Sequence, residues 1–230
     1  MPNWCDNSAT LSHEDKSKID ALEAELSKKN DQGYFAGQPL QHLHPNPSGE
    51  WDYDWSVKNW GTKWEMDVID YSRDDDNTIT IYFNSAWSPP TSAYDYLVEQ
   101  GWSVNALYNE PGMGFAGVYE NGTDDYYEYD ITAKSSIEEL PADVIDFGNL
   151  LEANREWVIN ELEDEWAGAE RTNWHTNEKP AYDGWYEIQT EGWEFTQFME
   201  FKDGDWDMYD PTKVTKWRGL KENPSEAEVG

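Results

Sequence analysis

The sequence predicts an α+β protein in which an antiparallel sheet with two helices is followed by a long helix and a small all-β module. Three observations support this class. Short segments that alternate apolar and polar side chains, as half-buried strands do, are separated by two segments with apolar residues at three- and four-residue steps. A longer helical pattern follows them. The last part of the chain consists of short strand-like runs divided by Asp-Gly turns.

The first two predicted elements are a strand and a helix. The strand is expected over residues 4–11, because the turn-prone Ser12 and His13 bound it. Ser12 is the expected N-cap of the helix, with acidic residues near the positive helix end. The buried stripe of the helix consists of Ile19, Leu22 and Leu26.

A loop and a hairpin follow. Residues 34–61 have no clean period and are rich in Pro and Trp, so a long ordered loop is expected there. Two strands are predicted over residues 65–71 and 78–84, the second with its Ile and Phe side chains on one face. The acidic link between them indicates a turn, so the two strands are expected to pair.

A second helix and three strands complete the first predicted domain. Pro89 and Pro90 favour the start of the helix, and Gly101 favours its end. After a strand over residues 102–108, strands over 115–120 and 125–131 flank the strong hairpin signal Asn121-Gly122. The order strand, helix, strand, strand, helix, strand is the ferredoxin-like pattern, here with an added hairpin.

The remaining chain is predicted to hold one long amphipathic helix and a β module. Pro141 is suited to the first position of the helix, which Gly168 ends. The strands of the module are expected over residues 185–188, 195–201 and 214–217. The predicted organisation is a ferredoxin-like domain at 1–135, the long helix at 136–170, the β module at 171–222 and a disordered tail at 223–230.

The charge of the chain restricts its partners. Forty-eight Asp and Glu against sixteen Lys and Arg give a formal net charge of -32, while aromatic residues at 15% favour a packed domain over a disordered one. Such a field repels nucleic acid and anionic membranes and attracts basic protein surfaces. The alternative is that the charge serves solubility alone.

The sequence also indicates a compartment. It contains no apolar run long enough to span a membrane, and its first residues lack the pattern of a signal peptide. The single cysteine, Cys5, fits a reducing compartment. A cytoplasmic location is therefore expected, that of a host cell if the protein is phage-encoded.

Four ordered sequence blocks carry a family resemblance. They are Met1–Asn7 (MPNWCDN), Trp55–Trp64 (WSVKNWGTKW), Thr80–Pro90 (TIYFNSAWSPP) and Tyr108–Gly117 (YNEPGMGFAG). Together they resemble phage and plasmid proteins with a YubB-type ferredoxin-like domain, over about Met1 to Ile131. The resemblance implies a ferredoxin-like fold and a mobile-element origin, and it implies no catalytic residue.

The C-terminal part carries a second resemblance. The blocks Gly184–Tyr186, Phe201–Trp206 and Val214–Leu220 are similar to a small phage domain of unknown function that ends in a Thr-His-Trp type signature. In this chain Lys216 stands where that signature has His. This resemblance also implies no activity.

The Trp-rich blocks contain candidate residues for a small-molecule site. A ligand pocket for a sugar, base or peptide could form from aromatic residues of the Trp-rich blocks and nearby polar groups. Its members would be Trp55, Asn59, Trp60, Trp64, Asn84, Trp87 and Glu110. The alternative is that these rings pack the long loop onto the sheet.

Metal and cofactor sites are not expected. His42 and His44 with Cys5 form at most a weak metal pattern, without a second Cys pair or a His-Glu-x-x-His motif. The acidic run Asp203–Asp207 resembles part of a calcium-binding loop, but its Gly is not at the position that such a loop requires. The run is therefore interpreted as a hairpin turn.

The favoured function is non-enzymatic. No phosphate loop or nucleophile elbow occurs, and we expect a phage-type accessory protein that binds a basic host or viral protein through an acidic, aromatic-rich surface. It could act as a nucleic-acid mimic that inhibits a host nucleic-acid-binding factor. The expected acidic face comprises Glu120, Asp124, Asp125, Glu128, Asp130, Glu152, Glu156, Glu163 and Asp164. The alternative is a small-ligand or nucleotide binder, or an enzyme, that uses the Trp-rich loop and Glu110.

Overall fold

The computed structural model describes residues 3–176, 178–193, 195–207 and 214–221. The chain divides into two compact units, residues 1–154 and 155–230, and the division falls inside the long helix. The predicted α+β class is confirmed, with antiparallel sheets, a long helix and a C-terminal β module. The predicted tail at 223–230 lies outside the described residues. No helix in the described ranges is both long and apolar enough to cross a bilayer.

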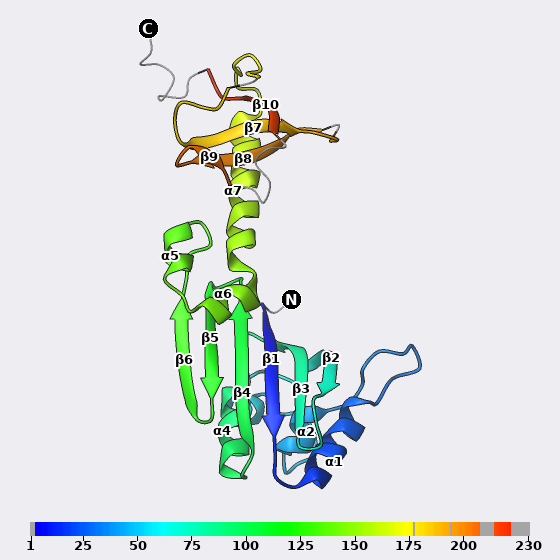
Figure 1. Cartoon of the computed structure of the whole chain (residues 1–230). Helices are drawn as coiled ribbons and strands as arrows, with labels where there is room; N and C mark the ends of the chain where they lie inside the picture. The colour runs from blue at the N-terminus through cyan, green and yellow to red at the C-terminus, as the bar shows by residue number, and fades with distance from the viewer. Residues whose placement is uncertain (1–2, 177, 194, 208–213, 222–230) are drawn as a thin grey trace. The chain divides into compact units, whose positions relative to one another are not determined.

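The first unit is built on a six-stranded antiparallel sheet in the order β2-β3-β1-β4-β5-β6 (Figure 1). Its strands are β1 (Trp4–Ser12), β2 (Asp67–Arg73), β3 (Thr78–Ala86), β4 (Ser103–Glu110), β5 (Phe115–Glu120) and β6 (Thr123–Glu128). Helix α1 (Lys16–Leu26) connects β1 to β2, and α4 (Thr91–Glu99) connects β3 to β4. The neighbour order of the first four strands is the ferredoxin-like one, and β5 and β6 extend the sheet beyond β4.

The main core lies between this sheet and helices α1 and α4. Ala9 of β1 stands between Ile81 of β3 and Ala106 of β4, and all three side chains are buried. The stripe predicted for α1 is buried as expected. The predicted N-cap is wrong: Asp15 caps α1 by accepting a hydrogen bond from Ser17 N, because Ser12 remains paired in β1.

The predicted long loop contains two short helices, α2 (Pro39–Leu43) and α3 (Tyr53–Asn59). The carboxylate of Glu65 accepts hydrogen bonds from Leu40 N at 2.7 Å and Gln41 N at 3.0 Å, in the first turn of α2. Burial raises the pKa of Glu65 to about 7, although these hydrogen bonds oppose the shift. Glu65 therefore holds α2 through contacts that are distant in sequence, and the local pattern of apolar residues does not predict this helix.

The other face of β4, β5 and β6 is covered by α5 (Lys134–Glu138) and α6 (Ala142–Gly148). Ile137 and Val144 are buried there against strand residues such as Leu107. The prediction of one continuous helix from Pro141 onward is wrong, because the chain forms two helices there. Asn149 adopts the left-handed conformation at φ 48° and ends α6, and α7 (Leu150–Trp166) follows it.

The second unit contains a four-stranded antiparallel sheet in the order β10-β7-β8-β9. The strands are β7 (Gly184–Thr190), β8 (Gln197–Lys202), β9 (Asp205–Trp206) and β10 (Val214–Arg218). Tyr186, Ile188 and Phe201 contribute to its core, together with two buried Trp side chains. The Asp203-Gly204 turn joins β8 to β9 with both residues at positive φ, as the sequence predicts for a hairpin.

Candidate functional site

The chain segment that forms β3 to β6 of the first sheet, including its edge strand β6, contains acidic residues but no basic ones. Between Arg73 and Lys134 the chain holds eleven Asp and Glu residues and no Lys, Arg or His. This stretch supplies β3 through β6, and β6 is the last strand in the sheet order. Figure 1 shows β6 at one edge of the sheet and β2 at the other. We call the exposed carboxylates of Asp124, Asp125 and Glu128 on β6, with Asp95 of α4, the acidic edge.

Aromatic side chains lie among these carboxylates. Asp124, Tyr126 and Glu128 alternate along β6 and so point to one face of the sheet. Tyr126 is 51% exposed, and its ring lies 5.3 Å from that of Phe115 on β5. The acidic edge therefore presents a partly exposed ring pair between charged groups.

Phenol groups hold two of these carboxylates in place. Tyr108 donates a hydrogen bond of 2.8 Å to Asp124 Oδ1, and Tyr119 donates one of 2.8 Å to Asp95 Oδ1. Burial, and secondly the adjacent carboxylates, raise the pKa values of both phenols, so each remains a neutral donor at physiological pH.

The carboxylates of the acidic edge have no cationic partner among the described residues. The ion pairs of the first unit lie elsewhere, as in the contacts of Arg73 with Asp20 at 2.9 Å and with Glu23 at 2.8 Å. Carboxylates that are oriented but not neutralised can accept hydrogen bonds from an incoming Lys or Arg.

The remaining residues of the predicted acidic face are exposed but distributed. Glu120 and Asp130 flank β6, and Glu152 lies at the start of α7 in the first unit. Glu156, Glu163 and Asp164 belong to the second unit. The structure thus groups the hairpin members of the predicted face within the first unit.

The predicted ligand pocket separates into buried and exposed parts. Trp60 is buried in the core, with its indole N–H donating to His44 O at 2.8 Å. Trp55 packs edge-on against Trp60 at 5.4 Å, and Asn59 donates to the Trp55 carbonyl. These three residues have structural roles, as the alternative interpretation predicted.

The polar members of that set are also enclosed. Glu110 is fully buried, and its Oε2 accepts a hydrogen bond of 2.5 Å from Met113 N, while Oε1 has no partner. Asn84 stands between Asp6 and Asp67 in the sheet register, with Oδ1 buried and unpaired.

The exposed Trp87 and the half-buried Trp64 belong to an aromatic group that the sequence only partly identified. The ammonium of Lys63 lies 4.6 Å from the centroid of each of these two rings. Trp4 packs edge-on against Trp64 at 6.2 Å, and Tyr53 packs edge-on against Trp87 at 6.4 Å. We call Trp4, Tyr53, Trp64 and Trp87 the aromatic cage. Trp4 and Tyr53 were not among the predicted pocket residues, and Trp4 is distant from the other three along the chain.

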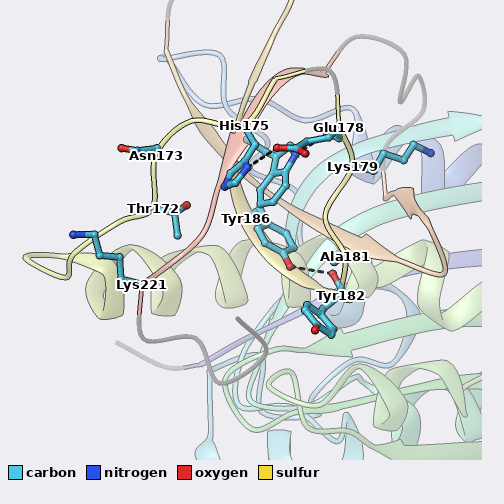
Figure 2. Close-up of a pocket in the computed structure, with 10 residues that line it drawn as sticks. Thr172, Asn173, His175, Glu178, Lys179, Ala181, Tyr182, Tyr186 and Lys221 are labelled. Carbon is cyan, nitrogen blue, oxygen red and sulfur yellow. Dashed lines mark hydrogen bonds and ion pairs between the residues drawn. The ribbon is translucent and has the colours of Figure 1, made fainter. Parts of the chain in front are cut away.

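The second unit contains a pocket of about 590 Å³ (Figure 2). Its imidazole, His175, stacks on Trp217 at 4.2 Å and contacts Glu178 Oε1 through Nδ1 at 2.7 Å. Lys179 and Lys221, at the rim, pair with Asp205 and Glu170. The pocket is lined by Thr172, Asn173, His175, Glu178, Lys179, Ala181, Tyr182, Tyr186, Trp217 and Lys221. Most of its charged groups are thus paired with one another or with neighbours.

The weak metal pattern is not assembled. His42 is exposed, whereas His44 stacks on Tyr96 at 3.7 Å, and burial raises the pKa of the enclosed Cys5 thiol. In the described ranges no three His, Cys, Asp or Glu side chains are grouped to hold a metal ion.

Comparison with known proteins gives one likeness. The chain is similar to a solved structure of the protein api92 from Yersinia pseudotuberculosis, described by the family model DUF1281. The TM-score is 0.38 and the identity 10%, over 56% of this chain and 99% of the other. A likeness of this degree carries no argument about function. No protein-family model matches the chain, and no curated protein matches it.

Proposed function

We propose that the protein is a non-enzymatic binding protein that docks a basic protein partner on its acidic edge. The observation that carries the proposal is the arrangement of Asp124, Tyr126 and Glu128 on the edge strand β6, exposed and without a cationic partner among the described residues. Carboxylates would meet Lys and Arg of the partner, and Tyr126 would supply an aromatic anchor.

A simpler explanation for charge on an edge strand is protection against strand pairing between molecules. Protection against strand pairing needs charged side chains on the edge strand, but it does not need those side chains to be held in one orientation. Asp124 and Asp95 are instead tethered by buried phenols, which restrict the side chains and fix the direction of their free oxygens. Prior ordering of this kind favours a specific partner, because less side-chain entropy is lost on binding.

The partner class that fits best is a nucleic-acid-binding protein, since its cationic surface already accepts rows of anionic groups. In this form the acidic edge would act as a nucleic-acid mimic. Displacement of bound nucleic acid from the partner by this protein would support that form, and a complex of all three components would exclude it.

The test is capture of proteins from a host lysate on three immobilised chains. The first is wild type, and the second is an edge variant with Asp124→Asn, Asp125→Asn and Glu128→Gln. The third is a matched control variant with Glu156→Gln, Glu163→Gln and Asp164→Asn, which removes the same number of exposed charges from α7.

We expect wild type and the control variant to retain the same basic protein at 0.1 M salt, and the edge variant to lose it. Retention should fall at 1 M salt, where the Debye length shrinks from about 10 Å to about 3 Å. Equal loss in both variants would mean that overall charge, not the acidic edge, attracts basic proteins, and it would refute the proposal.

A further inference from the structure

The aromatic cage holds a cation of its own chain. Lys63 Nζ lies 4.6 Å from the ring centroids of both Trp64 and Trp87, within the range in which a ring face attracts a cation. Each of these two rings also packs edge-on against a further ring, Trp64 against Trp4 and Trp87 against Tyr53. The cage is therefore occupied intramolecularly in this structure.

Three of the four rings of the cage are exposed, and the fourth, Trp64, is half-buried. Trp87 is 42% exposed, Tyr53 43% and Trp4 38%. They come from β1, from α3 and from the segments that follow α3 and β3, so the fold brings four separate stretches of chain together here. Grouped exposed aromatic rings are typical of a binding surface.

The backbone at Trp87 is strained in a way that the core does not require. Trp87 has φ 72°, a left-handed conformation that is an outlier for a bulky side chain. Its N–H donates to Asn3 O at 3.0 Å, and the next residue is fixed by Ser88 Oγ donating to Gly61 O at 2.6 Å. With this backbone conformation the indole of Trp87 is 42% exposed and lies near the ammonium of Lys63.

The spacing favours a cation larger than the one present. Optimal carbon–carbon contact is about 3.5–4.0 Å. A bare ammonium can approach a ring face at least as closely as a carbon, so a distance of 4.6 Å to each ring centroid leaves room for methyl groups on the nitrogen. Recognition of quaternary ammonium groups by aromatic cages uses this geometry.

The surroundings also attract positive charge. Trp4 shares its sheet face with Asp6, and Asp6 and Asp67 flank Asn84 in the register of β1, β3 and β2. The carboxylates lie beside the cage rather than in it. They raise the local concentration of cations without replacing the ring contacts.

We propose that the aromatic cage is a binding site for a quaternary or methylated ammonium group, and that Lys63 is an internal occupant which the ligand displaces. The site lies apart from the acidic edge and does not depend on it. Since Lys63 competes with the ligand, its removal should tighten binding. Contacts with two rings, the exposed Trp87 and the half-buried Trp64, predict a gain of about tenfold.

The experiment is a titration with tetramethylammonium chloride, followed by Trp fluorescence and by the indole N–H resonances, against sodium chloride at the same ionic strength. The proteins are wild type, Lys63→Ala, Trp87→Ala, Trp64→Ala and a control with Trp193→Ala, an exposed Trp of the second unit. A neutral tert-butyl alcohol serves as the probe of similar shape without charge.

Saturable binding to wild type, tightened about tenfold in Lys63→Ala, unchanged in Trp193→Ala and absent for the neutral probe, would support the inference. Lys63→Ala leaves the four rings in place, so the inference does not depend on whether the Trp variants fold. Absence of saturable binding to Lys63→Ala would overturn it, as would equal binding of the neutral probe. Because the edge variant retains the cage, its failure to capture a basic protein would leave this result unaffected.

Discussion

The phenol of Tyr108 on β4 reaches across β5 to donate a 2.8 Å hydrogen bond to Asp124 on β6. The path is open because residue 117 of β5 is Gly. A Cβ at that position would lie 2.3 Å from Tyr108 Oη and 2.5 Å from the carbonyl of Asp125. Three adjacent strands thus cooperate to orient one carboxylate of the acidic edge.

Gly117→Ala is expected to destabilise the first unit by about 1–3 kcal/mol, as overpacking of a closed site does. The Tyr108 ring would have to move, so the bond to Asp124 would be lost. Urea unfolding measures the change, and the Tyr108 phenol resonance reports the bond. Wild-type stability together with an intact hydrogen bond in Gly117→Ala would contradict the geometry.

Tyr108→Phe removes only the donor. We expect a loss of about 1–3 kcal/mol, because the acceptor is a carboxylate and the bond is partly buried. Tyr34→Phe is the control, since its ring is 69% exposed. Equal unfolding midpoints for the two variants would show that the Asp124 contact does not contribute to stability.

Glu65 predicts a pH dependence of a definite sign. Its pKa is raised from 4.5 to about 7 in the folded chain, so the folded state holds the proton more tightly than the unfolded state. This contribution to stability is fully present below pH 4.5 and is lost as the pH rises through about 7.

Glu65→Gln should therefore remove that dependence. The free energy of unfolding of wild type relative to the variant should fall by roughly 2–3 kcal/mol between pH 4.5 and pH 8. Denaturant unfolding at three pH values measures it, with the exposed Glu14→Gln as control. A difference that rises with pH would reverse the assignment.

Asn149 predicts opposite outcomes for two substitutions. At φ 48°, Asn149→Gly should be tolerated, whereas Asn149→Ala should cost about 1–2 kcal/mol. Thermal unfolding compares them. If alanine stabilised the chain, residues 142–166 would form one continuous helix in solution, as the sequence pattern alone suggests.

Glu187 is expected to be the most sensitive charge of the second unit. It accepts from Arg218 Nε at 2.7 Å and Thr196 Oγ1 at 2.6 Å, and Arg171 lies at 3.1 Å. Burial acts to raise its pKa, but the bonds from Arg218 and Thr196 outweigh burial, and the net pKa is lowered.

Glu187→Gln should destabilise the second unit by about 2 kcal/mol, because it leaves two guanidinium groups without their shared partner. Chemical-shift changes confined to residues 171–221 would localise the effect. Glu191→Gln, at an exposed position nearby, is the control. An unfolding midpoint equal to that of this control would contradict the role.

Most strands and the main helices could be predicted from the sequence because their signals are local. Asn121-Gly122 takes up φ 46° and 97°, as a tight hairpin requires, and the stripe of α1 is buried in full. The break at Asn149 could not be predicted, since the apolar period continues through it. Helix α2 could not be predicted because Glu65, a distant residue, holds it in place.

The candidate sites divide in the same way. The β6 members of the acidic edge could be predicted from the acidic composition of the 120–130 hairpin, whereas Asp95 of α4, which Tyr119 orients, was not among the predicted residues. The aromatic cage could not. Trp60 and Trp64 lie in the same Trp-rich block, and the sequence does not distinguish them. Trp60 is buried in the core, whereas Trp64 lies beside the ammonium of Lys63.

The central claim is tested most directly by the affinity of the captured basic protein, measured by titration calorimetry at 0.1 M salt. The edge variant, with Asp124, Asp125 and Glu128 neutralised, should bind at least about tenfold more weakly than wild type. The α7 control variant should bind within about twofold of wild type, since its substitutions lie outside the acidic edge. Equal dissociation constants for the edge and control variants would contradict the account.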